Sequence, residues 1–174
     1  TTPSSGNLTF TSTLTSELGD VDVQEFGFEI IAADPNFLPL TDANIHEAVD
    51  LWLSDEASAV DTYGHISNWD VSSVTDMHQM FDGASSFNGD LSSWDVSSVT
   101  HMDRMFRSAA SFNGDISAWD VSSVTNIGFM FQNTIFNSDL SSWDVSNVTN
   151  MRGVFSNTSS FNGDLSSWDV SSVT

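Results

Sequence analysis

Five tryptophans recur in this chain at spacings of 25, 25, 24 and 25 residues, and each lies in nearly the same eight-residue string. The strings read NWDVSSVT, SWDVSSVT, AWDVSSVT, SWDVSNVT and SWDVSSVT, around Trp69, Trp94, Trp119, Trp143 and Trp168. A period of about 20–50 residues is typical of a solenoid, because a unit of this size cannot bury its apolar face alone. The repeat therefore predicts a stack of similar units.

Within one repeat the spacing of apolar residues changes. Trp94 and Val96 alternate as in a strand. Val99, Met102, Met105 and Phe106 then follow at i, i+3, i+6 and i+7, which predicts a short helix with Ser97 or Ser98 as its N-cap. Asn113-Gly114 reads as a tight turn. We therefore expect an α/β solenoid with a parallel sheet on one side, helices on the other, and buried columns of tryptophan and of Phe87, Phe112, Phe136 and Phe161.

The recurring string W-D-V-S-x-V-T-x-M-x-x-M-F, followed by F-N-x-D-[LI], resembles the BspA-type leucine-rich repeat of bacterial surface proteins over residues 64–174. The chain departs from that string at His65, Ile127, Ser138 and Val154. The resemblance implies a curved, right-handed leucine-rich-repeat stack, a cell-surface location, and a binding or adhesive role. It does not imply an activity or a named ligand.

The regions outside the repeats predict the remaining organisation. We expect a linker at 1–7, a β segment at 8–40 that is part of a neighbouring sandwich-like domain or packs on the cap, a helical N-terminal cap at 41–63, and about four and a half repeats at 64–174. Asn44 and Glu47 have the spacing of a capping box. The apolar face expected for the cap helix comprises Ile45, Val49, Trp52 and Leu53. We also expect the natural protein to start before Thr1 and to continue past Thr174.

An aspartate follows each repeat tryptophan, and alternation along a strand would point it outward. These residues are Asp70, Asp95, Asp120, Asp144 and Asp169. Neighbouring strands lie about 4.8 Å apart, so adjacent carboxylates would repel by roughly 1–3 kcal/mol. Two explanations are open: the column binds Ca²⁺, or each aspartate accepts hydrogen bonds from the Ser-Ser bend that follows it. A second column, which either orders a turn or binds metal, comprises Asp90, Asp115, Asp139 and Asp164.

The charge balance excludes several classes of partner. The chain has 24 acidic and 3 basic residues, no lysine, and a net charge of −21. Nucleic acid is excluded because phosphate binding needs clustered positive charge, and anionic membranes are disfavoured for the same reason. No cysteine is present, which excludes disulfides, thiol catalysis and cysteine-based zinc sites. No apolar run is long enough for membrane insertion in this segment, and no signal peptide is recognisable.

The sequence shows no recognisable catalytic constellation. The four histidines, His46, His65, His78 and His101, share no repeat position, so no Ser-His-Asp triad is indicated. A glycosidase pair needs one carboxylate in an apolar pocket, and the aspartates are too regularly placed for that. We therefore expect a protein without enzymatic activity.

We expect an extracellular binding or adhesion module of a larger bacterial surface protein, whose partner is a protein, peptide or glycan on another cell or surface. The exposed face of the sheet is the expected binding surface, formed by Ser93, Asp95, Ser97, Asp120, Ser122, Ser142, Asp144 and Ser146. The alternative is a structural module that forms a homodimer, with calcium bridging the column of Asp70, Asp95, Asp120, Asp144 and Asp169.

Overall fold

The computed structural model describes residues 38–174, which belong to a compact unit running from Asn36 to Thr174. The predicted linker and the predicted β segment, apart from residues 38–40, lie outside the described residues. Within the described part of the chain, no helix is long and apolar enough to cross a membrane.

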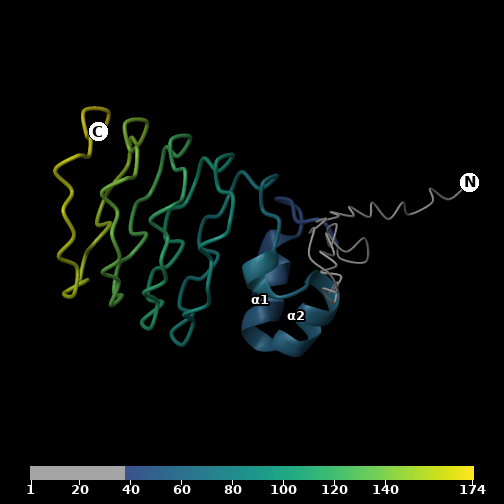
Figure 1. Ribbon diagram of the computed structural model, residues 1–174. Helices are drawn as coiled ribbons and strands as arrows, with labels where there is room; N and C mark the ends of the chain where they lie inside the picture. The colour runs from purple at the N-terminus through teal and green to yellow at the C-terminus, as the bar shows by residue number, and fades with distance from the viewer. Residues whose placement is uncertain (1–37) are drawn as a thin grey trace, which may run out of the picture. The chain divides into compact units, whose positions relative to one another are not determined.

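Two α-helices precede the repeats, in the region predicted as a cap (Figure 1). Helix α1 spans Ile45–Ser54, helix α2 spans Glu56–Tyr63, and the short 3-10 helix η1 follows at Ile66–Asn68. Asp55 separates the two α-helices. Its carboxylate accepts a hydrogen bond from the backbone N–H of Ser58, which makes it the N-cap of α2.

The apolar face of α1 is narrower than the sequence predicts. Ile45 and Val49 are fully buried, but Leu53 is 42% exposed. The predicted capping box is wrong, because the side chain of Asn44 makes no cap bond to α1 and instead accepts a hydrogen bond from the backbone N–H of Thr41. Ile45, Ala48 and Val49 of α1 belong to the same buried cluster as the first repeats.

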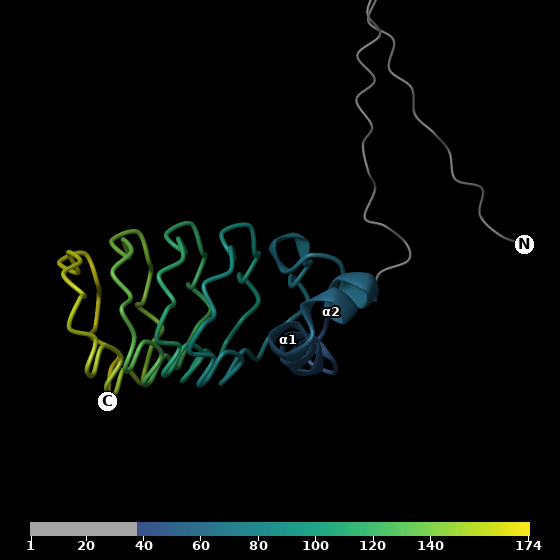
Figure 2. The same cartoon turned by 90° about the horizontal axis from the view of Figure 1, so that it is seen from below.

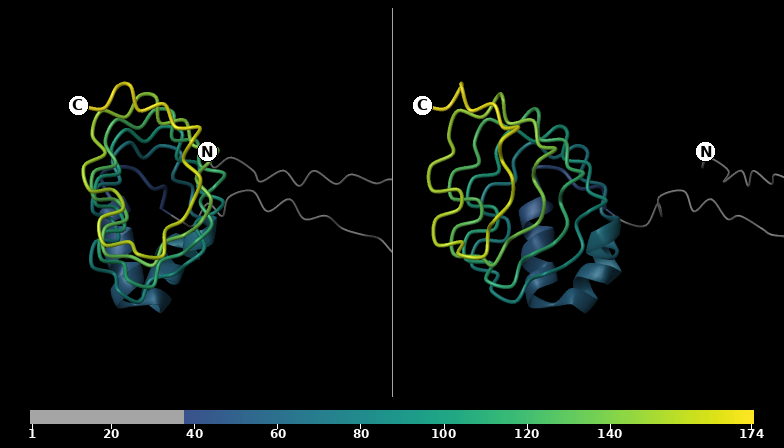
Figure 3. Two further views of the ribbon diagram at one scale, coloured as in Figure 1. Left: turned by 90° about the vertical axis from the view of Figure 1, so that its left-hand side faces the viewer. Right: turned by 60° about the vertical axis from the view of Figure 1, so that its left-hand side comes forward.

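The repeats wind into successive coils, which we number 1 to 4: residues 65–89, 90–114, 115–138 and 139–163, followed by the start of a fifth at 164–174. Figures 1 and 2 show the coils side by side in a row, and Figure 3 shows their similar outlines in a view along the row. Isolated parallel bridges join Asp76 to His101, His101 to Asn126, and Asn126 to Asn150.

The predicted α/β solenoid with a parallel sheet and short helices is wrong. Residues 38–174 contain no β-strand and no sheet, and their α-helices are α1 and α2, both before the repeats. The segments that we predicted as helices make main-chain hydrogen bonds to the next coil instead. Met77, Gln79, Phe81 and Gly83 each donate an N–H to coil 2, at 2.7–3.0 Å, and the same four positions repeat this from coil 2 to 3 and from coil 3 to 4.

Left-handed residues explain why this ladder is neither helix nor strand. Gln79, Arg104, Phe129 and Gly153 occupy one position of successive coils, all with φ between 56° and 62°. Four residues further on, Gly83, Ser108, Asn133 and Asn157 have φ between 57° and 75°. Such residues interrupt both a right-handed helix and an extended chain. The helical spacing of the apolar residues was therefore misleading. We call the outer surface of residues 75–83, 100–108, 125–133 and 149–157 the ladder side.

The segments predicted as strands are chains of tight turns. Each coil contains two five-residue units of the form Asp-apolar-Ser-Ser-apolar, such as 90–94 and 95–99. In places Ala or Asn replaces the second Ser, and His65 replaces the Asp of the first unit in coil 1. In the units 90–94 and 95–99, the N–H of Trp94 donates to the carbonyl of Leu91, and that of Val99 donates to Val96. We call these segments the turn units. Each unit points its two apolar side chains inward, so the burial that we attributed to strand alternation arises from turns.

The core contains aromatic columns, as predicted, packed among aliphatic side chains and methionines. Phe87, Phe112, Phe136 and Phe161 stack with centroid distances of 6.0, 6.0 and 6.4 Å. The first four repeat tryptophans are at most 5% exposed. Each indole from Trp94 onward donates its N–H to a carbonyl of the preceding coil, at 2.9–3.1 Å. These bonds fix the register between coils.

Candidate binding surface

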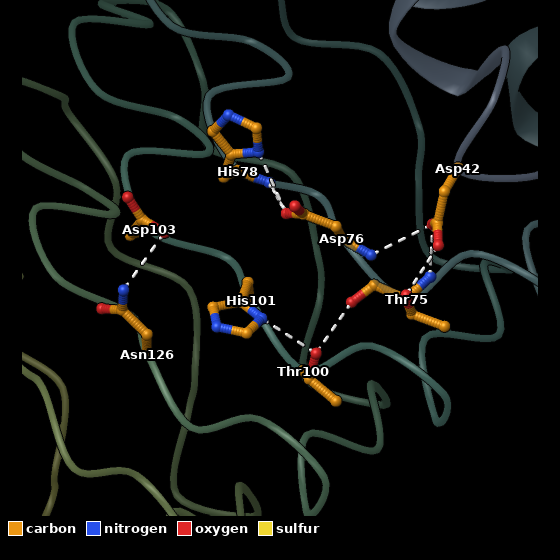
Figure 4. Close-up of polar contacts among 8 residues, drawn as sticks. All are labelled: Asp42, Thr75, Asp76, His78, Thr100, His101, Asp103 and Asn126. Carbon is orange, nitrogen blue, oxygen red and sulfur yellow. Dashed lines mark hydrogen bonds and ion pairs between the residues drawn. The ribbon is translucent and has the colours of Figure 1, made fainter.

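The ladder side begins at a polar cap made by Asp42, just before α1. Its Oδ1 accepts the backbone N–H of Thr75 at 2.7 Å, and its Oδ2 accepts the Thr75 hydroxyl at 2.7 Å (Figure 4). The Thr75 carbonyl in turn accepts the N–H and the hydroxyl of Thr100. Hydrogen bonds from the Thr75 hydroxyl and backbone lower the pKa of the Asp42 carboxyl below its ordinary value. The same bond between successive coils continues along a threonine column formed by Thr75, Thr100, Thr125, Thr149 and Thr174. Asp42 takes the place of a preceding coil for this column, a role that the sequence analysis did not find.

Next to this column lie the side chains shown in Figure 4. Nδ1 of His78 lies 3.0 Å from Oδ1 of Asp76, and Nδ1 of His101 lies 2.9 Å from the Thr100 hydroxyl. Asn126 donates from its amide to Asp103 at 3.2 Å. The His46 ring of α1 lies 5.2 Å from the His78 ring, which brings three of the four histidines to this region.

The ladder side is where the copies of the repeat differ most. The position of the bridge residues carries Asp, His, Asn and Asn in coils 1 to 4, at Asp76, His101, Asn126 and Asn150. The position three residues later carries Gln, Arg, Phe and Gly. By contrast, the Trp-Asp-Val-Ser string is the same in every copy. A side chain that differs between otherwise equal coils is not required for stacking. The sequence contained this signal, which appears once the copies are compared position by position.

All three arginines of the chain lie on the ladder side. Arg107 donates from Nε to Asp82 at 2.9 Å and forms an ion pair with the same carboxylate. Arg104 and Arg152 both lie over the ring of Phe129, at 5.8 and 5.6 Å from its centroid.

Formal charge divides unequally between the two surfaces. Of the twelve aspartates in residues 64–174, nine belong to turn units. The other three, Asp76, Asp82 and Asp103, match the three arginines, so the ladder side of the coils is formally neutral.

A family model described as "Mycoplasma protein of unknown function, DUF285" matches residues 53–135 and 132–174, which is most of the chain. The chain belongs to this family. No curated protein and no solved structure shows significant similarity to it. The DUF285 description names no activity.

The aspartates of the DUF285 repeat are held within their own turns. In each turn unit the carboxylate accepts the backbone N–H of the serine two residues later, at 2.9–3.1 Å, and in most units the serine hydroxyl as well. The hydrogen bonds that the sequence analysis expected between the first aspartate column and the Ser-Ser bend are therefore confirmed, and the second column orders its turns through the same kind of bond. His65 takes this place in the first coil, where its Nδ1 lies 2.8 Å from the Ser67 hydroxyl.

Hydrogen bonds outweigh repulsion in these columns. The Ser122 hydroxyl and backbone N–H lower the pKa of the Asp120 carboxyl, although the charges of Asp144 and Asp95 on the adjacent coils raise it. The same direction holds for Asp70, where Ser72 lowers the pKa and Asp95 raises it.

The structure places the predicted binding residues on the turn units and not on a sheet. The aspartates Asp95, Asp120 and Asp144 are exposed, whereas the serines Ser97, Ser122 and Ser146 are half-buried and donate back to them. Ser93 and Ser142 donate their hydroxyls to carbonyls of the preceding coil. Most of these side chains therefore have structural partners already.

A metal or catalytic centre is not evident in the described residues. No group of three or more His, Asp or Glu side chains comes close enough together there to hold a metal ion. A shallow open depression on α2 is lined by Glu56, Ala57, Val60 and Asp61, and none of these lies on the ladder side.

Proposed function

We propose that this chain is a non-enzymatic binding module of a larger extracellular surface protein, and that its partner is a protein, peptide or glycan bound along the ladder side. The observation that carries the proposal is the variation between copies. Stacking is performed by the turn units, the aromatic columns and the main-chain ladder, and the side chains that stacking leaves unspecified gather on the ladder side. The extracellular location rests on the resemblance of the repeat to bacterial surface proteins.

Paired variants on the two surfaces test this assignment. The protein is screened on glycan and peptide arrays, together with Asn126→Ala on the ladder side and Asp144→Asn on a turn unit. Loss of binding in Asn126→Ala alone supports the ladder side. Loss in Asp144→Asn alone returns the site to the turn units, as the sequence analysis predicted. Binding to nothing on either array contradicts a binding module for these ligand classes.

A second candidate is an assembly module in which calcium joins two copies. It is favoured by the second oxygen, Oδ2, of Asp70, Asp95, Asp120, Asp144 and Asp169, which accepts no hydrogen bond from the described residues. Carboxylate oxygens are natural Ca²⁺ ligands, and an ion shared between columns would relieve their repulsion. Light scattering separates the candidates: a dimer mass in calcium that reverts in chelator supports assembly, and a monomer in both excludes it.

A further inference from the structure

The most unusual feature of the ladder side is a row of three side chains from three successive coils: Arg104, Phe129 and Arg152. Both guanidinium carbons lie within 6 Å of the Phe129 centroid, where a cation is attracted to the face of the ring. Gly153 supports the ring from the next coil, because a Cβ on this residue would lie 2.8 Å from two ring carbons. The ring therefore has a defined position, and the arginines are oriented by it.

Neither of these arginines has a carboxylate partner among the described residues, although the chain carries 24 acidic side chains. Arg107, by contrast, is paired with Asp82. A guanidinium presents five N–H donors in a planar fork that suits carboxylate and sulfate-like oxyanions. The chain has too few basic residues to bind a polyanion along its whole length, as nucleic acid would require. Arg104 and Arg152 nevertheless keep their donors available on a part of the surface that is formally neutral, and they can bind two separate carboxylates there, whereas the turn units carry the excess negative charge.

The geometry of the stack sets the spacing that a ligand must match. Coils joined by parallel bridges lie about 4.8 Å apart, so two residues separated by two coils lie about 10 Å apart along the stack. The two arginines therefore favour a linear ligand with repeated anionic groups, lying across the coils. Planar hydrogen-bonding side chains, those of Gln79, His101, Asn126 and Asn150, lie on the same side, and they can donate to hydroxyl groups and accept from them.

Side-chain chemistry favours a polysaccharide over an acidic peptide. The amide and imidazole groups of Gln79, His101, Asn126 and Asn150 can exchange hydrogen bonds with the hydroxyl groups of a sugar chain. A row of polar side chains around one aromatic ring therefore suits a hydroxyl-rich chain better than it suits a peptide.

We propose that the Arg104–Phe129–Arg152 row binds an acidic polysaccharide, through carboxylate groups held by the two guanidinium groups. This proposal rests on the proposed function, since it names the ligand class for the same surface.

The test is calorimetric titration of the full chain with three probes of equal length: hexagalacturonate, the neutral hexasaccharide maltohexaose, and a hexamer of glutamate. We expect hexagalacturonate to bind and the other two to bind at least tenfold more weakly. The double variant Arg104→Gln/Arg152→Gln should lose at least tenfold in affinity for hexagalacturonate. Arg107→Gln removes a charge from the same side at a paired site and should change affinity less than twofold. A circular dichroism melt of each variant establishes that it is folded.

Each other result overturns the proposal. Equal binding of the glutamate hexamer would show that the surface recognises charge alone. Equal losses in Arg107→Gln and in the double variant would show a non-specific charge effect. Failure of hexagalacturonate to bind overturns the acidic polysaccharide but leaves the binding module intact if an array ligand is still lost in Asn126→Ala. Failure of every probe and every array ligand overturns both.

Discussion

Among single residues, the turn-unit aspartates repel one another between coils, and short-range hydrogen bonds from serine stabilise their charged form. Nine aspartates accept a backbone N–H from the serine two residues later. Each aspartate accepts these bonds from its own turn unit. The bonds outweigh the repulsion between aspartates of neighbouring coils, because the serine donates from its backbone and, in most units, from its hydroxyl as well. An aspartate in this position is therefore primarily a turn former.

We predict that Asp120→Ala and Asp120→Asn will differ in stability. Alanine removes the acceptor and leaves the Ser122 N–H without its partner, which should lower the free energy of unfolding by about 1 kcal/mol. Asparagine keeps an acceptor oxygen and removes one charge from the column, so it should change stability by no more than about 0.5 kcal/mol. Urea denaturation of both variants measures the difference. Equal losses would mean that the charge, and not the acceptor, matters.

The Asp42 cap should also contribute to the stability of the fold. Its two oxygens bind the N–H and hydroxyl of Thr75 and the N–H of Asp76, so Asp42→Ala leaves the start of the threonine column uncapped. By analogy with helix caps, we expect a loss of about 1–2 kcal/mol in the free energy of unfolding. Asp50→Ala is the matched control, since Asp50 is an exposed aspartate on α1. If Asp42→Ala and Asp50→Ala have the same melting temperature, Asp42 has no capping role.

At the scale of the element, one coil is a set of turns joined to its neighbours by main-chain bonds. Its shape depends on two left-handed residues in each ladder segment. Glycine occupies one such position in coil 1, at Gly83, and asparagine occupies it in coils 3 and 4, at Asn133 and Asn157. Both residue types tolerate this conformation, whereas Ser108 of coil 2 has φ 59° with less intrinsic preference for it.

We therefore predict opposite effects for two substitutions at Ser108. Ser108→Asn should retain or slightly raise stability, because asparagine accepts a positive φ and can pair with Asn133 as Asn157 does, at 2.9 Å. Ser108→Val should lower the free energy of unfolding by about 1–2 kcal/mol, because a β-branched residue is strained there. Thermal melts compare the two. A stable valine variant would show that the ladder segment can relax to an extended strand.

At the scale of the whole molecule, stability depends on pH through many equivalent carboxylates. Hydrogen bonds from serine lower the pKa of the turn-unit aspartates below the ordinary value, although the charges of neighbouring aspartates raise the pKa of Asp70 and Asp120. A lowered folded pKa means that the charged form is favoured by folding. The corresponding stability is present above the unfolded pKa and is lost as the pH falls through the folded value.

We expect the melting temperature to be nearly constant down to about pH 5 and to fall below about pH 4. The control is Asp120→Asn, which should lose slightly less stability over this range because one coupled carboxylate is gone. A melting temperature that rises steadily on acidification would instead show that relief of the −21 net charge dominates over the turns.

Calcium binding should also affect the stability of the whole molecule. Because no three ligands converge in residues 38–174, we expect weak binding that needs millimolar Ca²⁺. Binding to the folded state alone raises stability by mass action, so the melting temperature should rise more in Ca²⁺ than in Na⁺ at matched ionic strength. Mg²⁺ should do less, because it gives up its water reluctantly. Identical melting temperatures in calcium and in chelator would mean that the columns need no ion.

The sequence determines the features of this molecule that depend on interactions within a repeat, and it determines less where interactions between coils decide the conformation. The sequence alone predicts the repeat, the buried Trp and Phe columns and the aspartate–serine bonds. These features depend only on the spacing of residues within one string or between identical strings. The sheet and the repeat helices were predicted wrongly. Val99, Met102, Met105 and Phe106 have the spacing of a helix, but their neighbours Arg104 and Ser108 adopt positive φ. That conformation is selected by hydrogen bonds to the next coil, which no single repeat contains. The row of Arg104, Phe129 and Arg152 has the same origin, because only stacking brings Arg104 and Arg152, each about 25 positions from Phe129, onto its ring.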